Sequence, residues 1–376
     1  MVTARSFRIA VLPGDGIGPE VMAPALEILT AARRLAGASE LLLDVCPAGA
    51  EAYRSSGEAL PAATMLRCEE ADAILLGAMG DPTVRYPDGT ELKPQVDLRL
   101  RLDLYAGVRP VRSVPGLPSP LAHAQARNLD IVIVRESTEG LFYSLAQPRT
   151  DCDDDSFETL RISRQASTRV FDFALKLAER RRGAGRAGHV TCVDKANVFP
   201  AFAFFREIFQ ERAAAYPGLT TDAAYVDAAA LNLVRSPWRY DVIVTENMFG
   251  DILSDLCAGL VGGIGLAPSA DIGDTHAVFQ PCHGSAPDIA GQDRANPVAM
   301  ILSTALMLEW LAERFEDRSL SLAAAVIRLA VDTAFLDGRC IPMELGGNEG
   351  TRAVADRVLS RLEESLQTVR LDGAPT

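Results

Sequence analysis

The chain has 376 residues, a net charge of −13 and a hydrophobic content of 48%. That length suits two domains better than one ordinary core, and the composition is that of a globular enzyme. The acidic balance and the lack of a basic stripe argue against nucleic acid as a partner. No apolar run reaches 18 residues, and the first residues lack the apolar segment of a signal peptide, so neither a membrane span nor a leader is predicted.

The seven cysteines are scattered along the chain, and no two have the CxxC spacing. An odd number without metal-ligand spacing predicts reduced thiols in a cytoplasmic protein, rather than a disulfide framework. Cys282 precedes His283, but no second pair completes a zinc site.

Short β-branched segments alternate with longer helical patterns. Strands are predicted at Phe7–Leu12, Leu41–Val45, Ala73–Leu76, Ile131–Val134, Val190–Val193, Ala224–Val226, Val242–Val244 and Ala277–Phe279. Helices are predicted at Pro19–Leu35, Thr168–Arg182, Pro200–Tyr216, Ala228–Val234, Asp251–Gly259, Pro297–Phe315 and Thr351–Thr368. This alternation predicts an α/β protein with much parallel sheet.

A glycine-rich loop containing Gly14, Gly16 and Gly18 follows the first predicted strand. Its spacing is G-x-G-x-G, whereas a Rossmann phosphate loop has G-x-G-x-x-G. Pro19 also stands where the helix would offer backbone N–H groups to a pyrophosphate. The loop therefore does not favour an ordinary Rossmann site.

Charged residues directly follow several predicted strands: Arg135, Asp194 with Lys195, Asp227 and Glu246. Because ligands of α/β sheets bind outside the carboxyl ends of the strands, these side chains are expected to converge on one crevice. The alternative is that polar residues simply begin loops, which explains any one of them better than the whole set.

Three arginines, Arg99, Arg109 and Arg135, have the chemistry to hold a substrate with two carboxylates. The planar guanidinium binds a carboxylate through two hydrogen bonds, so three converging groups would orient such a molecule. Lys195 lies at the end of a strand beside Asp194. Near a metal its pKa would be lowered, which suits a role in proton transfer.

Asp251 and Asp255 lie four residues apart just after a predicted strand. On a helix that spacing places both carboxylates on one face, where they suit Mg²⁺ or Mn²⁺. An Asp pair on a solvated helix face is the alternative. The later segment 283–297 is rich in Gly, Ala and Pro and allows a backbone to approach a flat ligand. Together the two segments favour a metal-bound hydroxy acid beside a nucleotide.

Motifs spread over nearly the whole chain resemble the metal-dependent β-decarboxylating dehydrogenases of 2-hydroxy acids, the isocitrate/isopropylmalate dehydrogenase family. They are PGDGIGPEV, LRLRLDLYAGVRPVR, VRESTEG, VDKAN, YVDAAALNLVRSP, NMFGDILSDL, HGSAPDIAGQDRANP and ELGGNEGT. The isopropylmalate dehydrogenase branch is the most similar in overall character. The resemblance implies that family's two-domain α/β fold with mixed sheets, not a Rossmann fold.

The resemblance also implies the domain organisation. Residues 1–104 and 262–376 would form a discontinuous large domain on the cofactor side. Residues 105–261 would form a central domain with the metal and substrate residues, the dimer interface and an intersubunit arm near residues 142–163. In the implied homodimer, Lys195 and Asp227 would reach the site of the partner subunit.

The implied activity is the NAD- and Mg²⁺- or Mn²⁺-dependent oxidative decarboxylation of a substituted (2R)-malate. The three arginines would bind carboxylates, and Lys195 would take the hydroxyl proton. The implied metal ligands are Asp227, Asp251 and Asp255. The implied cofactor residues are His283, Gly284, Ser285, Ala286, Asp288, Ile289, Asn296 and Asn197. Asp288 predicts NAD rather than NADP, because a carboxylate accepts a hydrogen bond from the ribose 2′-hydroxyl and repels a 2′-phosphate.

The chain departs from the family pattern where the catalytic acid is expected. Phe142 occupies the position of the family's tyrosine, which protonates the enolate, and Tyr143 comes one residue later. On a strand a shift of one residue reverses the face of the side chain, so Tyr143 is not expected to replace the missing hydroxyl. Glu246 and Gln280 are further departures.

The segment that selects the substrate also departs from the isopropylmalate pattern of one Glu and two Leu. This chain has Leu92, Gln95 and Val96, with Lys93 between them. Lys93 and Gln95 suit a polar or charged third substituent on the malate. Tartrate or D-malate, and isocitrate or homoisocitrate, therefore stay open as substrates beside 3-isopropylmalate.

Two functions of other kinds also stay open. Phe142 favours a catalytically weak relative that binds nucleotide or acid as a regulatory subunit, whereas the intact lysine, aspartates and arginines favour an enzyme. An ordinary Rossmann 2-hydroxyacid dehydrogenase is disfavoured by the glycine spacing and by the lack of a convincing His–Asp pair among four histidines.

Overall fold

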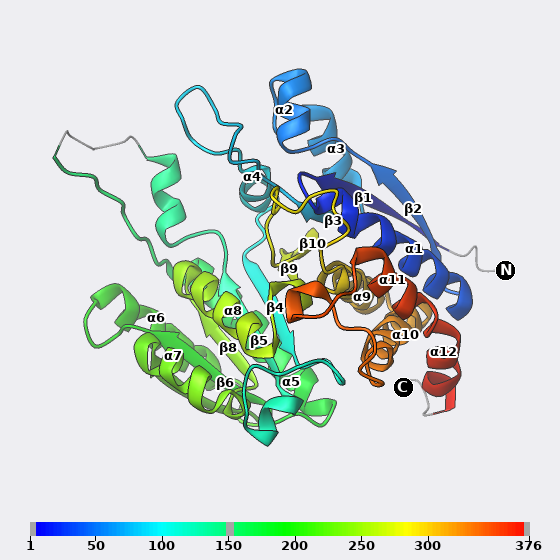
Figure 1. Ribbon diagram of the computed structural model, residues 1–376. Coiled ribbons are helices and arrows are strands. Elements are labelled where there is room, and N and C mark those ends of the chain that lie inside the picture. Colours follow the sequence, from blue (N-terminus) through cyan, green and yellow to red (C-terminus); the bar gives the residue numbers. More distant parts are fainter. Residues whose placement is uncertain (1–4, 148–153, 372–376) are drawn as a thin grey trace.

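The computed structural model describes residues 5–147 and 154–371 of the chain (Figure 1). The strands are β1 (Ser6–Gly14), β2 (Glu40–Val45), β3 (Ala73–Ala78), β4 (Ala106–Arg112), β5 (Asp130–Glu136), β6 (His189–Asp194), β7 (Thr220–Tyr225), β8 (Val242–Thr245), β9 (Pro268–Ile272) and β10 (Ala277–Pro281). The helices are α1 (Gly18–Ala36), α2 (Ala50–Ser56), α3 (Ala62–Glu70), α4 (Pro94–Arg101), α5 (Arg164–Gly183), α6 (Pro200–Ala213), α7 (Val226–Arg235), α8 (Asn247–Val261), α9 (Val298–Phe315), α10 (Arg318–Ala334), α11 (Thr351–Leu359) and α12 (Leu362–Leu371).

The strands of the described segments form one mixed sheet in the order β2-β1-β3-β10-β9-β4-β5-β8-β6-β7. The pairs β10·β9, β9·β4 and β4·β5 are antiparallel, and the outer pairs are parallel. The prediction of an α/β fold with mixed sheet is therefore confirmed. Figure 1 shows β1–β3 with α9–α12 on one side of the molecule and α5–α8 on the other.

Each of the eight predicted strands overlaps a strand of the sheet, although Val226, predicted as the end of a strand, begins α7. Strands β4 and β9 were not predicted from the sequence. The predicted helices are also present, although the segment 351–368 holds two short helices, α11 and α12, rather than one. Helices α2, α3, α4 and α10 were missed. Both missed strands lie at the centre of the sheet.

One face of the sheet is covered by the largest apolar core, and it runs under nearly every strand. Alternate residues such as Val108 of β4, Val134 of β5 and Ala270 of β9 point into this core. Helix α5 packs against β4 and β5, α9 packs against β9, and α1 packs against β1 and β3. Side chains alternate between the two faces of a strand, so their neighbours must point to the opposite face.

The opposite face carries two separate cores. Leu98 of α4 and Met65 of α3 pack over β1, β3 and β10, whereas Leu253 of α8 and Leu233 of α7 pack over β5, β6 and β8. The central strands between these two cores point polar side chains to this face. Among them are Arg109, Arg135 and Asp271. The fold therefore leaves a polar gap at the middle of the sheet.

The predicted boundary between the two domains falls between the neighbouring strands β9 and β4. The largest core extends across that boundary, since it contains both Phe7 of β1 and Phe171 of α5. The two-domain division stays a prediction. So does the intersubunit arm near residues 142–163, of which residues 148–153 lie outside the described part of the chain.

The glycine-rich loop after β1 packs against protein backbone. Gly16 has a φ of 55°, and a Cβ there would lie 2.0 Å from the Ser285 carbonyl oxygen. The Ile17 N–H donates to the same oxygen at 2.8 Å. This loop therefore packs directly against the backbone of the segment after β10.

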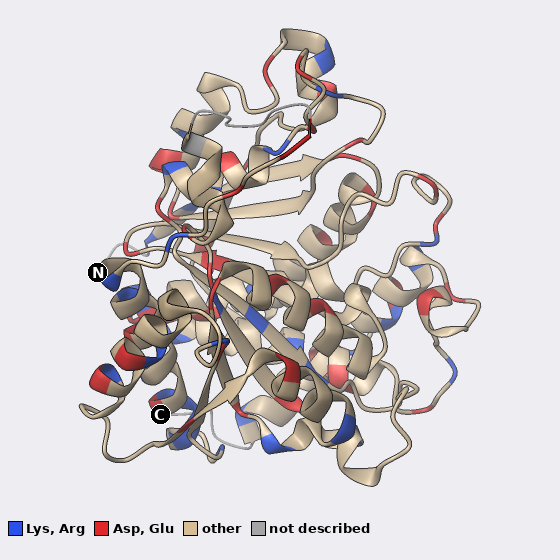
Figure 2. Ribbon diagram, turned by 90° about the vertical axis from the view of Figure 1, so that its left-hand side faces the viewer, with Lys and Arg blue, Asp and Glu red and all other residues tan. Residues whose placement is uncertain are grey.

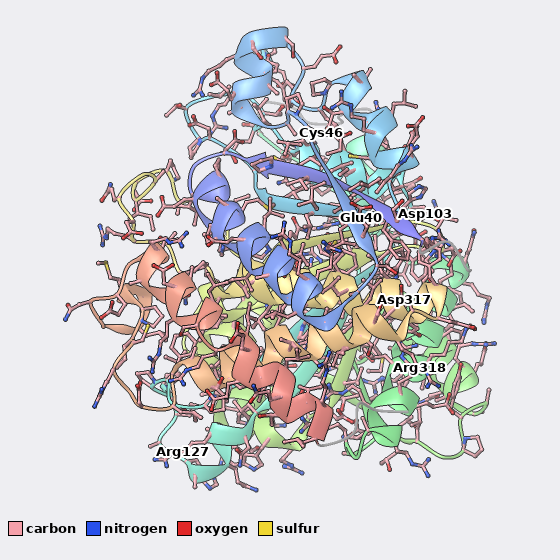
Figure 3. The ribbon with its side chains drawn as sticks, turned by 90° about the vertical axis from the view of Figure 1, so that its right-hand side faces the viewer. Glu40, Cys46, Asp103, Arg127, Asp317 and Arg318 are labelled. Carbon is pink, nitrogen blue, oxygen red and sulfur yellow. The ribbon has the colours of Figure 1, made fainter. Side chains whose placement is uncertain are left out.

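The edge strand β2 is tied to the C-terminal helices. The Ser39 hydroxyl, just before β2, donates to the Asp317 carboxylate at 2.5 Å, at the start of α10. Figure 3 shows Asp317 near Glu40 in this region.

Acidic and basic residues lie interspersed over the helices and loops (Figure 2). No helix in the described segments is long and apolar enough to cross a membrane, and the six cysteines described there are free.

Candidate active site

A cavity of about 310 Å³ lies over the middle of the sheet, in the polar gap between α4 and α8. The ends of β3 and β10 form one side, and residues of β4, β5 and β9 also line it. The charged side chains of its lining are Arg99, Arg109, Arg135, Asp251 and Asp255. The structure thus brings all three predicted substrate arginines together with two of the three predicted metal ligands.

The three arginines come from three different elements: Arg99 from α4, Arg109 from β4 and Arg135 from β5. Each is only 6% exposed. Arg109 and Arg135 point to the same face because both lie at the alternate positions that face away from the largest core. Buried guanidinium groups require compensation by anions, so this cavity is built to receive negative charge.

A buried carboxylate, Asp271 of β9, holds two of these arginines. Its Oδ2 accepts from Arg99 Nη2 at 2.9 Å, and its Oδ1 accepts from Arg109 Nη2 at 3.0 Å. Burial opposes the ionisation of this carboxyl, but Arg109 and Arg99 outweigh burial and hold its pKa well below the usual range. The sequence analysis did not identify Asp271. Its strand was not predicted, and no motif marks it.

Arg135 is held from the other side of the cavity. Its Nη2 donates to Asn247 Oδ1 at 2.6 Å, and its Nη1 donates to the Asp251 carboxylate of α8. Burial lowers the pKa of Arg135 to about 10, against the attraction of Asp251 and with the repulsion of Arg99 and Arg109. A bound anion would relieve that repulsion, which is a physical reason for this site to bind carboxylates.

Asp251 and Asp255 lie one turn apart on α8, as predicted, and both border the cavity. Burial raises the pKa of the Asp255 carboxyl, and the negative charge of Asp251 raises it further. Two carboxylates whose charges repel each other at a cavity wall are a fitting pair of ligands for a divalent cation. A cation between them would favour the ionised form of both.

Lys195 and Asp227 come from other segments of the chain. Neither borders the arginine cavity or the two further cavities described below. They pair with each other, with Lys195 Nζ 2.8 Å from Asp227 Oδ1, and the Asp227 side chain is 70% exposed. Within the described segments, no three acidic, histidine or cysteine side chains of one chain form a group able to hold a metal. Asn197, three residues after Asp194, is also exposed and lines neither cavity.

Phe142 borders the cavity, and Tyr143 does not. Both lie in a 3₁₀ helix (Leu141–Ala146), so the strand geometry assumed for this segment in the sequence analysis is wrong. The Phe142 ring lies 6.0 Å from the Arg99 guanidinium. The Tyr143 ring lies 5.3 Å from the guanidinium of Arg161 and lines a neighbouring cavity of about 730 Å³. No tyrosine therefore lines the arginine cavity.

The substrate-selecting segment is split among three surroundings. Gln95 and Val96 border the arginine cavity, and the Gln95 Oε1 atom is buried without a hydrogen-bond partner. Lys93 borders the neighbouring cavity instead. Leu92 packs with Ala50 in a small apolar cluster.

A further cavity of about 260 Å³ lies next to the first and contains four of the predicted cofactor residues. These are His283, Ala286, Ile289 and Asn296. His283 borders both cavities. Its Nδ1 is 2.9 Å from the Gly284 carbonyl oxygen, and its Nε2 has no partner. Burial lowers the pKa of this imidazole, so it is neutral at pH 7.

The remaining predicted cofactor residues have different surroundings. Gly284 borders the arginine cavity, Ser285 is buried against the glycine-rich loop, and Asp288 is exposed outside both cavities. The sequence analysis missed Glu344, whose Oε2 accepts from Asn296 Nδ2 at 2.9 Å and whose Oε1 accepts from the Gly265 N–H at 2.9 Å. Its signal was the ELGGNEGT motif, in which Glu344 is the first residue.

Comparison with known proteins gives matches along nearly the whole chain. Residues 8–358 match the family model described as Isocitrate/isopropylmalate dehydrogenase. A 3-isopropylmalate dehydrogenase from Salinibacter ruber is 43% identical, with 97% of this chain and 98% of that protein covered. A 3-isopropylmalate/3-methylmalate dehydrogenase from Methanocaldococcus jannaschii is 40% identical, with 95% and 99% covered.

Solved structures agree with these sequence matches. The crystal structure of isocitrate dehydrogenase from Methylococcus capsulatus has a TM-score of 0.82 at 36% identity and covers 95% of this chain and 99% of its own. A β-decarboxylating dehydrogenase from Thermococcus kodakarensis has a TM-score of 0.78 at 33% identity, with 97% and 98% covered. The similarity therefore extends over the segments on both sides of the sheet.

Proposed function

This chain belongs to the isocitrate/isopropylmalate dehydrogenase family, and from that premise we propose that it catalyses the NAD- and metal-dependent oxidative decarboxylation of a substituted (2R)-malate. The observation that carries the proposal is the single cavity in which three buried arginines meet two aspartates. The arginines would bind the substrate carboxylates, and the aspartates would bind a divalent cation. A binding module has no use for both in one cavity beside a second cavity bordered by a neutral histidine.

In this proposal Arg99, Arg109 and Arg135 bind the substrate carboxylates and fix its orientation. Because each guanidinium is buried and already held by a neighbouring carboxylate or amide, little reorganisation is needed when substrate binds. The α-hydroxyl would then lie on the side of Asp251 and Asp255. Lys195 would accept its proton. His283, Ala286, Ile289 and Asn296 at the adjoining cavity would hold NAD, which would supply the hydride acceptor.

Asp227, Asp251 and Asp255 would hold Mg²⁺ or Mn²⁺. Such a cation supplies Lewis-acid stabilisation of negative charge on the substrate oxygens, both when the hydroxyl loses its proton and when CO₂ leaves. The fit is supported by the mutual repulsion of Asp251 and Asp255 at the cavity wall. We assign Asp227 to a second copy, since it borders neither cavity of its own chain.

A homodimer would supply that second copy. Helices α7 and α8 pack together and expose large apolar side chains: Leu231 is 56% exposed, Val234 49% and Ile252 61%. An exposed apolar face of this kind is typical of an obligate subunit interface. Asp227 lies on α7 and Asp251 on α8, so an interface here would bring Asp227 and Lys195 of one subunit towards the cavity of the other.

Relatives named for 3-isopropylmalate and 3-methylmalate support a malate with an uncharged third substituent. Gln95 in the cavity wall favours a more polar substituent, so tartrate, D-malate, isocitrate and homoisocitrate stay as alternatives. Phe142 keeps a catalytically weak regulatory subunit open as the alternative of another class.

The decisive experiment is NADH formation by the purified protein with Mn²⁺ and 3-isopropylmalate, D-malate, tartrate, isocitrate or homoisocitrate. We expect one acid to give a kcat/KM well above the others, activity that is lost in EDTA and restored by Mn²⁺, and a preference for NAD over NADP. Full activity in EDTA would contradict the metal assignment. Binding of nucleotide or acid without turnover of any of the five would favour the regulatory alternative.

A further inference from the structure

Asp271 occupies the centre of the substrate cavity's supporting wall. It lies on β9 between β10 and β4, and it is 1% exposed. Both oxygens of its carboxylate are used: Oδ1 accepts from Arg109, and Oδ2 accepts from Arg99 and from Gln280 Nε2, the latter at 2.9 Å. One carboxylate thereby joins α4, β4 and β10 directly beneath the place where substrate carboxylates would bind.

The neighbouring strand makes room for this arrangement. Gly107 of β4 pairs with Asp271 across the sheet. A Cβ at Gly107 would lie 3.2 Å from Asp271 Oδ1 and 2.5 Å from Ser137 Oγ. The absence of a side chain at position 107 therefore allows the carboxylate to reach Arg109.

The electric charges around the cavity balance only when Asp271 is counted. The cavity wall carries three arginines and two aspartates. Asp271, just behind the wall, cancels the remaining positive charge. If the proposed function holds, Lys195 and Asp227 of a second copy cancel each other. The two positive charges of the cation are then left to be matched by the substrate.

We propose that Asp271 is the residue that positions Arg99 and Arg109 and that, by removing one positive charge, sets the cavity to prefer a substrate with two carboxylates over one with three. Its partner Gln280 keeps the carboxylate oriented without adding charge. The inference rests on the proposed function, since it concerns the selection of substrate at that site.

Gln280 and Asp271 are hydrogen-bonded to each other. A test can therefore move the negative charge from position 271 to position 280. Asp271→Asn removes the charge. Asp271→Asn combined with Gln280→Glu restores a carboxylate in the same cluster and keeps a hydrogen bond between the two positions. Asp274→Asn is the matched control, because it makes the same charge change three residues along the chain, at a residue that accepts from Tyr105 and lies outside the arginine cavity.

Binding is measured on the whole protein in saturating Mg²⁺, through the further rise in unfolding temperature with millimolar 3-isopropylmalate, which has two carboxylates, or isocitrate, which has three. A hydrogen bond to a charged group contributes enough free energy that Asp271→Asn should weaken the binding of 3-isopropylmalate by about 10- to 100-fold. The affinity for isocitrate should fall by a factor at least about tenfold smaller than the affinity for 3-isopropylmalate. The reason is that the added positive charge attracts the third carboxylate of isocitrate. The double variant should return both affinities to within about threefold of wild type, and Asp274→Asn should change neither.

Equal weakening of both acids by Asp271→Asn would mean a merely structural ion pair and would overturn the inference. If Asp271→Asn does not fold, the double variant decides: a double variant that fails to fold, or that binds differently from wild type, overturns it as well. Absence of binding of either acid to the wild type would instead refute the arginine site itself, and with it the proposed function.

Discussion

At the scale of single residues, Phe142 is the side chain that distinguishes this cavity from the family pattern. It borders the cavity but offers no proton, and the Tyr143 hydroxyl belongs to the neighbouring cavity. Phe142→Tyr should raise kcat on 3-isopropylmalate by about 10-fold or more, since general acid catalysis contributes about 10²- to 10⁴-fold. Tyr143→Phe should leave kcat nearly unchanged. Steady-state kinetics of both variants measure this.

An unchanged or lower kcat in Phe142→Tyr would show that another group protonates the enolate, or that the substrate's third substituent needs the apolar ring. The matched comparison with Tyr143→Phe separates these outcomes from a general disturbance of the 3₁₀ helix, because both variants change one hydroxyl in that helix.

His283 gives a prediction about pH. Burial lowers its pKa below that of the unfolded chain, about 6.5, so on acidification the unfolded state takes up a proton before the folded state does. Stability is therefore full above the unfolded pKa and is lost as the pH falls from there towards the folded pKa. In urea unfolding, wild type should lose more stability than His283→Gln between about pH 7.5 and about pH 5.5. An equal loss in the two proteins would contradict the assignment of a buried neutral imidazole.

The sequence predicted the residues of the site better than it predicted their supports. Arg99, Arg109 and Arg135 converge as expected, because family motifs and strand ends marked them. Asp271 was missed, since it contacts the arginines from behind and its role depends on packing between distant segments. Glu344 was missed although it is the first residue of the ELGGNEGT motif. No local pattern distinguishes a buried counter-charge such as Asp271 from an ordinary Asp.

At the scale of elements, helix α8 depends on its first cap. Glu246 is buried at its N-terminus and accepts from the backbone N–H groups of Phe249, at 2.7 Å, and Met248, at 3.1 Å. Helices with an oxygen acceptor at this position are more stable, because the first N–H groups otherwise lack partners. The cap also fixes the start of the helix that presents Asp251 and Asp255.

Glu246→Ala should therefore lower the free energy of unfolding by about 1–2 kcal/mol. Glu246→Gln is the control, since its amide oxygen can still accept one of these bonds, and it should cost less. Chemical denaturation of both variants measures the difference. If alanine and glutamine cost the same, the cap does not act through its hydrogen bonds.

The elements missed by the sequence analysis have physical reasons. Strand β4 reads AGVRPVR and β9 reads PSADI, so neither is a run of β-branched residues. Arg109 of β4 and Asp271 of β9 point into the polar gap, which interrupts the apolar pattern at the very strands that build the site. The two strands are stable because the largest core covers their other face, through Val108 and Ala270. That stabilisation comes from tertiary packing and is not visible in a local pattern.

At the scale of the whole molecule, one chain does not complete the proposed site. Asp251 and Asp255 border the arginine cavity, whereas Asp227 of α7 pairs with Lys195, which follows β6, and neither borders that cavity. Helices α7 and α8 also carry exposed apolar side chains, among them Leu231 and Ile252. A dimer across this face would bury them and would combine the two halves of the site from different subunits.

Mixing two inactive variants tests this arrangement directly. Lys195→Met and Asp251→Asn should each be inactive as homodimers, because one lacks the base and the other a metal ligand. In a mixed dimer, one site would receive Lys195 from the second variant and Asp251 from the first, and would be intact. The other site would carry both defects. Unfolding and refolding an equal mixture should yield mixed dimers in about half of the molecules and therefore about a quarter of wild-type activity.

The double variant Lys195→Met with Asp251→Asn, refolded with wild type, is the control for the mixing procedure. There each mixed dimer has one defect in each of its two sites, so activity should come only from wild-type homodimers. If the two single variants recover no activity although mixed dimers form, then each site takes Lys195 and Asp251 from the same chain. In that case Lys195 would have to move towards the cavity of its own subunit, and the proposed exchange across the α7–α8 face would be wrong.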